Sequence, residues 1–84
     1  MTQLSQATSP TPAALAGVPE DTAHELQNRG CEAVLYEVAP DAPTNTDDAF
    51  LLPPGAVRIF GVAAGESCWV WSPAGDSRVA YGTT

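Results

Sequence analysis

The chain has 84 residues, with ten Asp or Glu against three Arg and no Lys, so its formal net charge is −7. Affinity for nucleic acid comes mainly from cationic side chains that neutralise phosphates, so this charge argues against nucleic acid and against an anionic membrane surface as partners. The length allows one domain at most. A domain this small is marginally stable unless a disulfide, a metal or oligomerisation assists it.

The composition predicts neither a metal site nor a cofactor. A structural zinc site needs four Cys or His ligands, and the chain offers only Cys31, Cys68 and His24. We expect the two cysteines to be reduced thiols in the core, with a disulfide as the alternative. Oligomerisation then remains as the stabiliser.

The first eighteen residues carry no charged side chain, unlike the rest of the chain. Prolines restrict their own φ and the residue before them to extended geometry, and this region contains or adjoins Pro10, Pro12 and Pro19. We therefore expect residues 1–18 to form an extended or flexible arm and residues 19–84 to form the domain. Such an arm is either a disordered tail or a segment that adds a strand to the sheet edge of a neighbour. Its apolar anchors would be Leu4, Leu15 and Val18.

After residue 21, apolar and polar residues alternate in short runs separated by Gly and Pro. This period of two predicts strands that bury one face. The six predicted strands are residues 22–28, 32–39, 49–52, 56–63, 67–72 and 77–82. Their short separations indicate consecutive hairpins. Together they predict an all-β fold, a small antiparallel β-sandwich or barrel.

No motif in the sequence predicts an enzyme. His24 is the only residue available as the base of a nucleophilic triad, and we interpret it as a solvated or edge-strand histidine beside Glu25. The acidic pairs 20–21 and 47–48 fall at predicted turns, where carboxylates are solvated. Residues 41–48 are acidic but too interrupted by proline to match a calcium-binding loop.

Trp69 and Trp71 fall on the same face of one predicted strand. Their rings suit either a stacking platform for a sugar or a position in the core or at a subunit interface, and the small number of aromatic residues favours the latter. The arginines are either solvated at strand ends or engaged in ion pairs between subunits. The residues that we expect at a subunit or capsid interface are Leu4, Leu15, Val18, Trp69, Trp71, Arg58 and Arg78.

Five segments taken together resemble small β-sandwich virion proteins of tailed bacteriophages. They are LQNRG (26–30), AVLYEV (33–38), LLPPGAVRIF (51–60), AGESCWVWSPAG (64–75) and SRVAYG (77–82). The resemblance spans about residues 22–82, leaves the N-terminal region unmatched and carries over no catalytic residue. It implies a virion structural protein, first of all a capsid decoration (cement) protein that binds and stabilises the outside of the head.

The resemblance also implies partners and a location. The partners would be the major capsid protein lattice and further copies of the chain in a homotrimer. The protein would be made in the host cytoplasm and lie on the head exterior, where its acidity is better suited than near packaged DNA. Two alternatives stay open: a glycan- or receptor-binding module of a head fibre or tail, and a tail adaptor or tube-associated structural protein.

Overall fold

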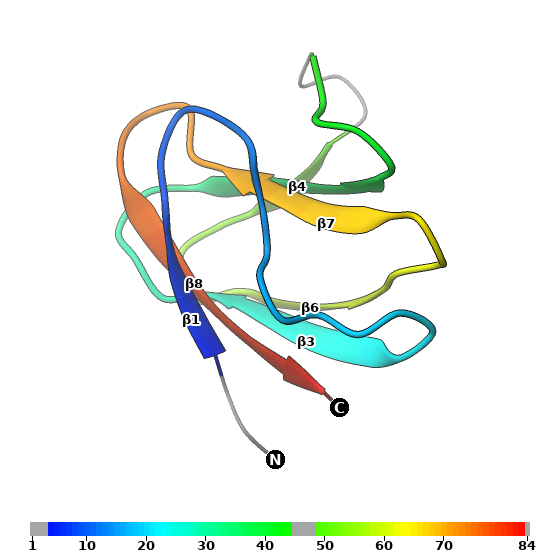
Figure 1. Cartoon of the computed structure of the whole chain (residues 1–84). Coiled ribbons are helices and arrows are strands. Elements are labelled where there is room, and N and C mark those ends of the chain that lie inside the picture. The colour runs from blue at the N-terminus through cyan, green and yellow to red at the C-terminus, as the bar shows by residue number, and fades with distance from the viewer. Residues whose placement is uncertain (1–3, 45–48, 84) are drawn as a thin grey trace.

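The computed structural model describes residues 4–44 and 49–83, and these residues contain strands but no helix. The strands are β1 (Leu4–Thr8), β2 (Ala13–Ala14), β3 (Ala23–Asn28), β4 (Val34–Ala39), β5 (Phe50–Leu52), β6 (Val57–Gly61), β7 (Ser67–Trp71) and β8 (Ser77–Thr83). They form two four-stranded antiparallel sheets, which lie over one another as two layers in Figure 1. The prediction of an all-β fold is confirmed.

The first sheet has the strand order β1-β8-β3-β6 and the second has the order β2-β7-β4-β5. Each connection between described strands therefore passes from one sheet to the other, except the one between β4 and β5. The predicted series of consecutive hairpins is wrong. Short connections that contain Gly and Pro suit a passage between two layers about 10 Å apart as well as they suit a hairpin, so the spacing cannot separate the two.

All six predicted strands are present as β3 to β8, with ends within two residues of the predicted bounds. Alternation places one face of each strand inward. In β4, for example, Val34 and Tyr36 are buried whereas Leu35 lies on the opposite face. The buried cluster between the sheets consists of Leu15, Leu26, Val34, Tyr36, Leu52, Phe60, Val62, Cys68, Val70, Val79 and Tyr81.

An extended N-terminal arm is not confirmed. The strand β1 pairs along its whole length with β8, from Leu4 opposite Tyr81 to Thr8 opposite Ser77, and β2 pairs with β7. Leu15 is only 6% exposed and belongs to the core. An uncharged segment that contains prolines is extended whether it pairs with its own sheet or with that of a neighbour. Its composition does not tell whether it adds to its own sheet or to that of a neighbour.

The turn after β3 is held by Asn28, a fully buried polar residue. Its side-chain amide donates to the carbonyls of Glu32 (2.7 Å) and Leu52 (2.9 Å), and its side-chain oxygen accepts from Gly30 N–H and Ser77 Oγ. Gly30 lies directly against Ser77, where a Cβ would collide. This end of the sandwich is therefore joined across both sheets by one side chain.

Candidate interaction site

A sandwich of two sheets has two sides, along which the edge strands of both sheets run. In this molecule β1 and β2 border one side, and β5 and β6 border the other. We call the first the closed side and the second the open side, for the reasons that follow. The edge strands at both sides leave backbone groups without a strand partner, so each side is a place where another chain can attach.

The closed side is bridged by hydrogen bonds between the two sheets. The Gln6 side chain on β1 donates to the Ala14 carbonyl and accepts from the Ala16 N–H, each at 3.2 Å. The Tyr81 hydroxyl on β8 donates to the Ala16 carbonyl at 2.7 Å. These three bonds join the edges of the two sheets, so their polar groups are already satisfied within the chain.

Two further features protect the same side. The hydroxyls of Thr8 and Ser72 are hydrogen-bonded at 2.9 Å in a buried position, and the Ser72 N–H donates to the Ser9 carbonyl. The connection between β1 and β2 contains Pro10 and Pro12, which lack the N–H that a pairing strand requires. The closed side therefore offers little to an incoming strand.

The open side differs because large apolar side chains are exposed along both of its edge strands. Phe50 is 63% exposed and Ile59 is 66% exposed. The full set of exposed apolar side chains on this side is Phe50, Leu51, Val57 and Ile59. These residues come from β5 and β6, which a short Pro-Pro-Gly-Ala turn connects. Two of them, Phe50 and Ile59, line the same hollow, and exposed apolar groups that adjoin one another mark interaction surfaces.

A hollow of about 550 Å³ lies between these two edge strands. It is lined by Tyr36, Glu37, Val38, Phe50, Ile59 and Phe60. Among these lining residues, the rings of Tyr36 and Phe50 stack with centroids 5.5 Å apart. Burial raises the pKa of the Tyr36 hydroxyl, an effect that nearby Arg58 partly opposes and Cys68 reinforces. The hollow brings one exposed side chain from each edge strand, Phe50 and Ile59, into one surface.

Arg58 is the one charged residue on β6. Register places it opposite Leu26 on the face directed toward the other sheet, yet it is exposed because β6 is an edge strand. Its guanidinium donates to the Val57 carbonyl at 2.9 Å. An inward-directed charge on an edge strand is a common device against indiscriminate strand pairing. Arg58 therefore restricts which strands can add to this edge.

The two tryptophans share one face of β7, as predicted, but differ in exposure. Trp71 is 3% exposed, and Trp69 is half-buried with its indole N–H donating to the Ala39 carbonyl at 3.0 Å. A stacking platform for sugars needs flat ring faces that are accessible. Trp71 does not present one in this structure.

The other residues expected at an interface lie in different places. Leu15 is in the core, Val18 packs against it, and Leu4 is partly exposed on the closed side near Gly17. Arg78 is exposed and donates to the Ser5 hydroxyl at 3.4 Å. The structure thus brings Arg58 to the open side and does not bring the other expected interface residues to it.

His24 is not the solvated or edge-strand residue that we expected. It is 2% exposed, on the central strand β3, and its ring stacks on Phe60 with centroids 5.4 Å apart. Its Nε2 lies 2.7 Å from the Thr22 hydroxyl. The adjacent Glu25 suggested solvent, but alternation places neighbouring residues of a strand on opposite faces.

The two cysteines are free thiols, as expected, but only one is in the core. Cys31 is exposed in the turn after β3. Cys68 is buried on β7, and burial raises its pKa from 9.0 to about 12. The expectation of two core cysteines is therefore right for Cys68 and wrong for Cys31, which lies beyond the end of the alternating pattern.

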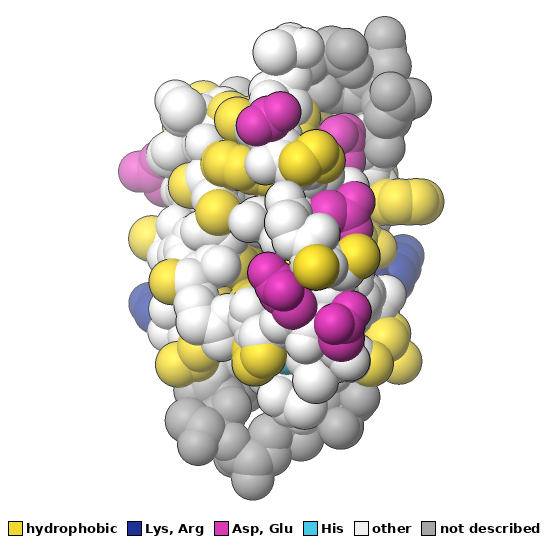
Figure 2. Space-filling view, turned by 45° about the vertical axis from the view of Figure 1, so that its right-hand side comes forward, with side chains coloured by type: hydrophobic (Ala, Val, Ile, Leu, Met, Phe, Trp, Pro, Cys, Tyr) yellow, Lys and Arg dark blue, Asp and Glu magenta, His cyan; other side chains and the backbone are white. Residues whose placement is uncertain are grey.

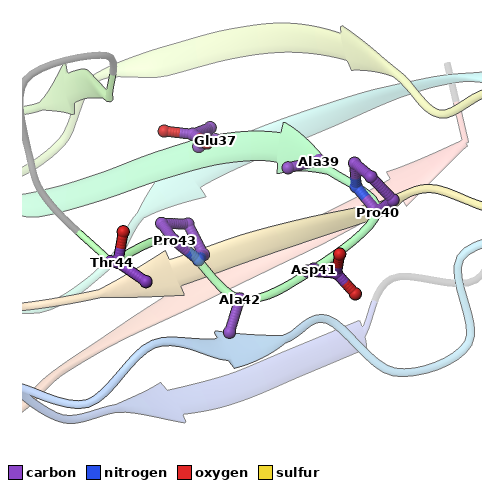
Figure 3. A pocket seen from close by; sticks show the side chains of 7 residues that line it. All are labelled: Glu37, Ala39, Pro40, Asp41, Ala42, Pro43 and Thr44. Carbon is purple, nitrogen blue, oxygen red and sulfur yellow. The ribbon is translucent and has the colours of Figure 1, made fainter.

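Acidic groups occur elsewhere on the surface. In the face shown in Figure 2, acidic side chains are spread among hydrophobic ones, and arginine or lysine side chains appear only at its margins. A second hollow, of about 340 Å³, follows β4 and is lined by Glu37, Ala39, Pro40, Asp41, Ala42, Pro43 and Thr44. Figure 3 shows the carboxylates of Glu37 and Asp41 pointing in different directions. Residues 45–48 of the predicted acidic loop lie outside the described residues.

Among residues 4–44 and 49–83, no group of three or more His, Cys, Asp or Glu side chains is placed to hold a metal ion. The same residues include no helix long and apolar enough to cross a membrane.

The exposed apolar residues of the open side were not singled out from the sequence. The available signal was that β6 carries apolar residues on both faces, with Phe60 on one face and Val57 and Ile59 on the other. Such a strand is either covered on both faces or an uncovered edge, and sequence alone does not distinguish the two. Comparisons with protein-family models, with curated proteins and with solved structures find no match to this chain.

Proposed function

We propose that this chain is a capsid decoration protein, which binds the outside of a tailed-phage head and stabilises it. The observation that carries the proposal is the open side, an apolar surface on an otherwise polar and acidic module, because such a surface suits attachment to protein. The motif resemblance of residues 22–82 to phage virion β-sandwich proteins supports the same class. The net charge of −7 suits a position outside the shell, away from DNA.

The physical basis would be binding to a repeating lattice. A contact that is weak for one copy becomes firm when linked copies engage neighbouring lattice positions. A protein that binds only the assembled shell stabilises the shell by mass action. The proposed role therefore requires accessible protein surface and no reacting group.

The experiment is to mix the purified protein with mature heads of the parent phage that lack it. We expect the protein to sediment with the heads and to appear by electron microscopy at regularly repeated positions over the shell. Unexpanded precursor heads serve as the comparison, since a cement protein should favour the mature lattice. Absence of binding to mature heads would refute the proposal.

The same images distinguish the alternatives. A glycan- or receptor-binding module would lie at the tips of fibres or of the tail, and a tail adaptor would form a ring at the neck or tail. The half-buried Trp69 and the exposed Phe50 are the aromatic features among the described residues that suit a glycan contact, and the burial of Trp71 weakens this alternative.

A further inference from the structure

The outer edge of β6 has no strand partner among the described residues, although the Val57 carbonyl accepts a hydrogen bond from the Arg58 guanidinium at 2.9 Å. The Asn28 amide donates to the Ala56 carbonyl at 3.1 Å. Because hydrogen-bonded pairs alternate along an antiparallel ladder, Arg58 and Phe60 direct their backbone groups toward β3. The residues that direct theirs outward are Val57, Ile59 and Gly61. No described strand lies on that side of β6.

We propose that this edge pairs with β6 of a second copy, antiparallel, about a two-fold axis at Ile59. The inference names the self-contact of the molecule and depends only on the open side, so it does not rest on the virion assignment. In this arrangement Ile59 meets Ile59 of the second copy, and Val57 lies opposite Gly61. The first sheets of the two copies then form one continuous sheet.

Arg58 selects this register. Residues directly opposite each other in a sheet lie on the same face, so a two-fold axis at Arg58 would oppose two guanidinium groups, which is unfavourable. An axis at Ile59 instead places Arg58 opposite Phe60 of the second copy, an uncharged residue, so the two guanidinium groups are not opposed. The charge that discourages other pairings is thus accommodated in this one.

The charge of β6 also permits two acidic molecules to approach here. Each copy carries a net charge of −7, so copies repel one another over most orientations. The strand β6 contains no carboxylate, and its one charged residue is an arginine. Contact along β6 therefore opposes no carboxylates of the two paired strands.

The area fits a reversible dimer. The exposed apolar side chains nearest to the paired strands, Phe50, Val57 and Ile59, offer on the order of 200 Å² per copy, taking roughly 100 Å² for an aliphatic and 150–250 Å² for an aromatic side chain before allowing for partial burial. Standard interfaces bury about 800 Å² per partner. Strand backbone and the rim of the hollow must supply the rest, so we expect dissociation in the micromolar range.

The first test is sedimentation equilibrium over protein concentrations from about 1 μM to about 500 μM, a range chosen to span the expected dissociation constant. The wild type should change from the 8.7 kDa monomer to a dimer across this range. Ile59→Lys should weaken the dimer at least tenfold, although it lowers the net negative charge and thus the general repulsion. Ala7→Lys is the matched control, because it adds the same charge to the exposed edge strand of the closed side. Near-ultraviolet circular dichroism checks that each variant is folded.

The second test reads the register by disulfide formation in a Cys31→Ser background. Opposed residues in a hydrogen-bonded pair have Cα atoms about 5.5 Å apart, which suits a disulfide. Ile59→Cys should therefore give an oxidised dimer, whereas Val57→Cys, which lies opposite Gly61, should not. Monomer at every concentration, a trimer, or a dimer unaffected by Ile59→Lys would overturn the proposal. Preferential cross-linking through Val57→Cys would overturn the register.

A trimer, in particular, is the state that the resemblance implies, so the measured mass decides between it and the two-fold dimer. A wild-type protein that is monomeric at every concentration yet decorates heads would refute the dimer and leave the proposed function in place. A dimer that does not bind heads would support the pairing of two copies and refute the proposed function.

Discussion

The two sides of this sandwich show different solutions to the same problem of edge strands. On the closed side, Gln6 and Tyr81 join the edges of the two sheets through Ala16, and prolines occupy the connection. On the open side, no hydrogen bond within residues 4–44 and 49–83 joins the edges of β5 and β6, and apolar side chains are exposed instead. This difference shows that the edge strands of one side are bonded to each other within the chain, whereas those of the other side are available to a partner. The three predictions below test this difference.

The largest expected effect concerns burial. Leu15→Ala on the closed side should lower the free energy of unfolding by about 2–5 kcal/mol, because the residue is in the core and its removal leaves a cavity. Leu51→Ala on the open side removes the same atoms from an exposed position. It should change the free energy of unfolding by less than about 0.5 kcal/mol. Urea unfolding at low protein concentration measures both. Equal losses would show that the two sides do not differ as described.

The next effect concerns pH and Cys68, which lies behind the closed side and accepts the Leu15 N–H through its carbonyl at 2.9 Å. Burial raises its folded-state pKa to about 12, whereas in the unfolded chain the thiol ionises near 9.0. Its contribution to stability is therefore complete below pH 9 and is lost as the pH rises toward 12, by about 1 kcal/mol per pH unit.

Urea unfolding at pH 8 and pH 10 measures this loss. Cys68→Ala should reduce the difference between the two pH values, and Cys31→Ser, at an exposed thiol, should leave it unchanged. Tyr36 and Tyr81 also have pKa values raised by burial and add a loss of the same sign at higher pH, so the comparison ends at pH 10. An unchanged difference in Cys68→Ala would contradict the assigned burial of the thiol.

The smallest effect concerns one hydroxyl. Tyr81→Phe removes the bond to Ala16 across the closed side and leaves that carbonyl without its donor, so stability should fall by about 1 kcal/mol. Tyr36→Phe is the matched control, because the Tyr36 hydroxyl makes no such bond between the sheets. Thermal unfolding compares the two variants. A larger loss in Tyr36→Phe would mean that the open side is held together by polar contacts as well.

Much of the fold could be predicted because its signals are local. Alternation in residues 32–39 placed Val34 and Tyr36 on the same face, which the structure shows to be the buried one, and the Pro-Pro-Gly turn separated β5 from β6. The strand order could not be predicted, since the passage between sheets at nearly every turn depends on contacts distant in sequence. The pairing of β1 with β8 could not be predicted for the same reason, because these strands lie at opposite ends of the described chain.

The candidate site was predicted less well. Arg58 was expected at an interface and does lie on the open side, but the apolar residues around it were not identified. Trp71 is buried, in agreement with the preferred interpretation of the tryptophans as core or interface residues and not with a stacking platform. Exposure depends on which strands become edges, and that is settled by pairing between distant segments.

The sequence by itself determined the strand positions, the residues that share a face in most strands and the acidity of the chain, because period-two alternation and charge are properties of neighbouring residues. Only the tertiary structure decided that residues 4–16 complete their own sandwich and that β5 and β6 remain at the edge. Those outcomes depend on the relative free energies of alternative strand pairings over the whole chain. The residues of a single segment do not determine these free energies.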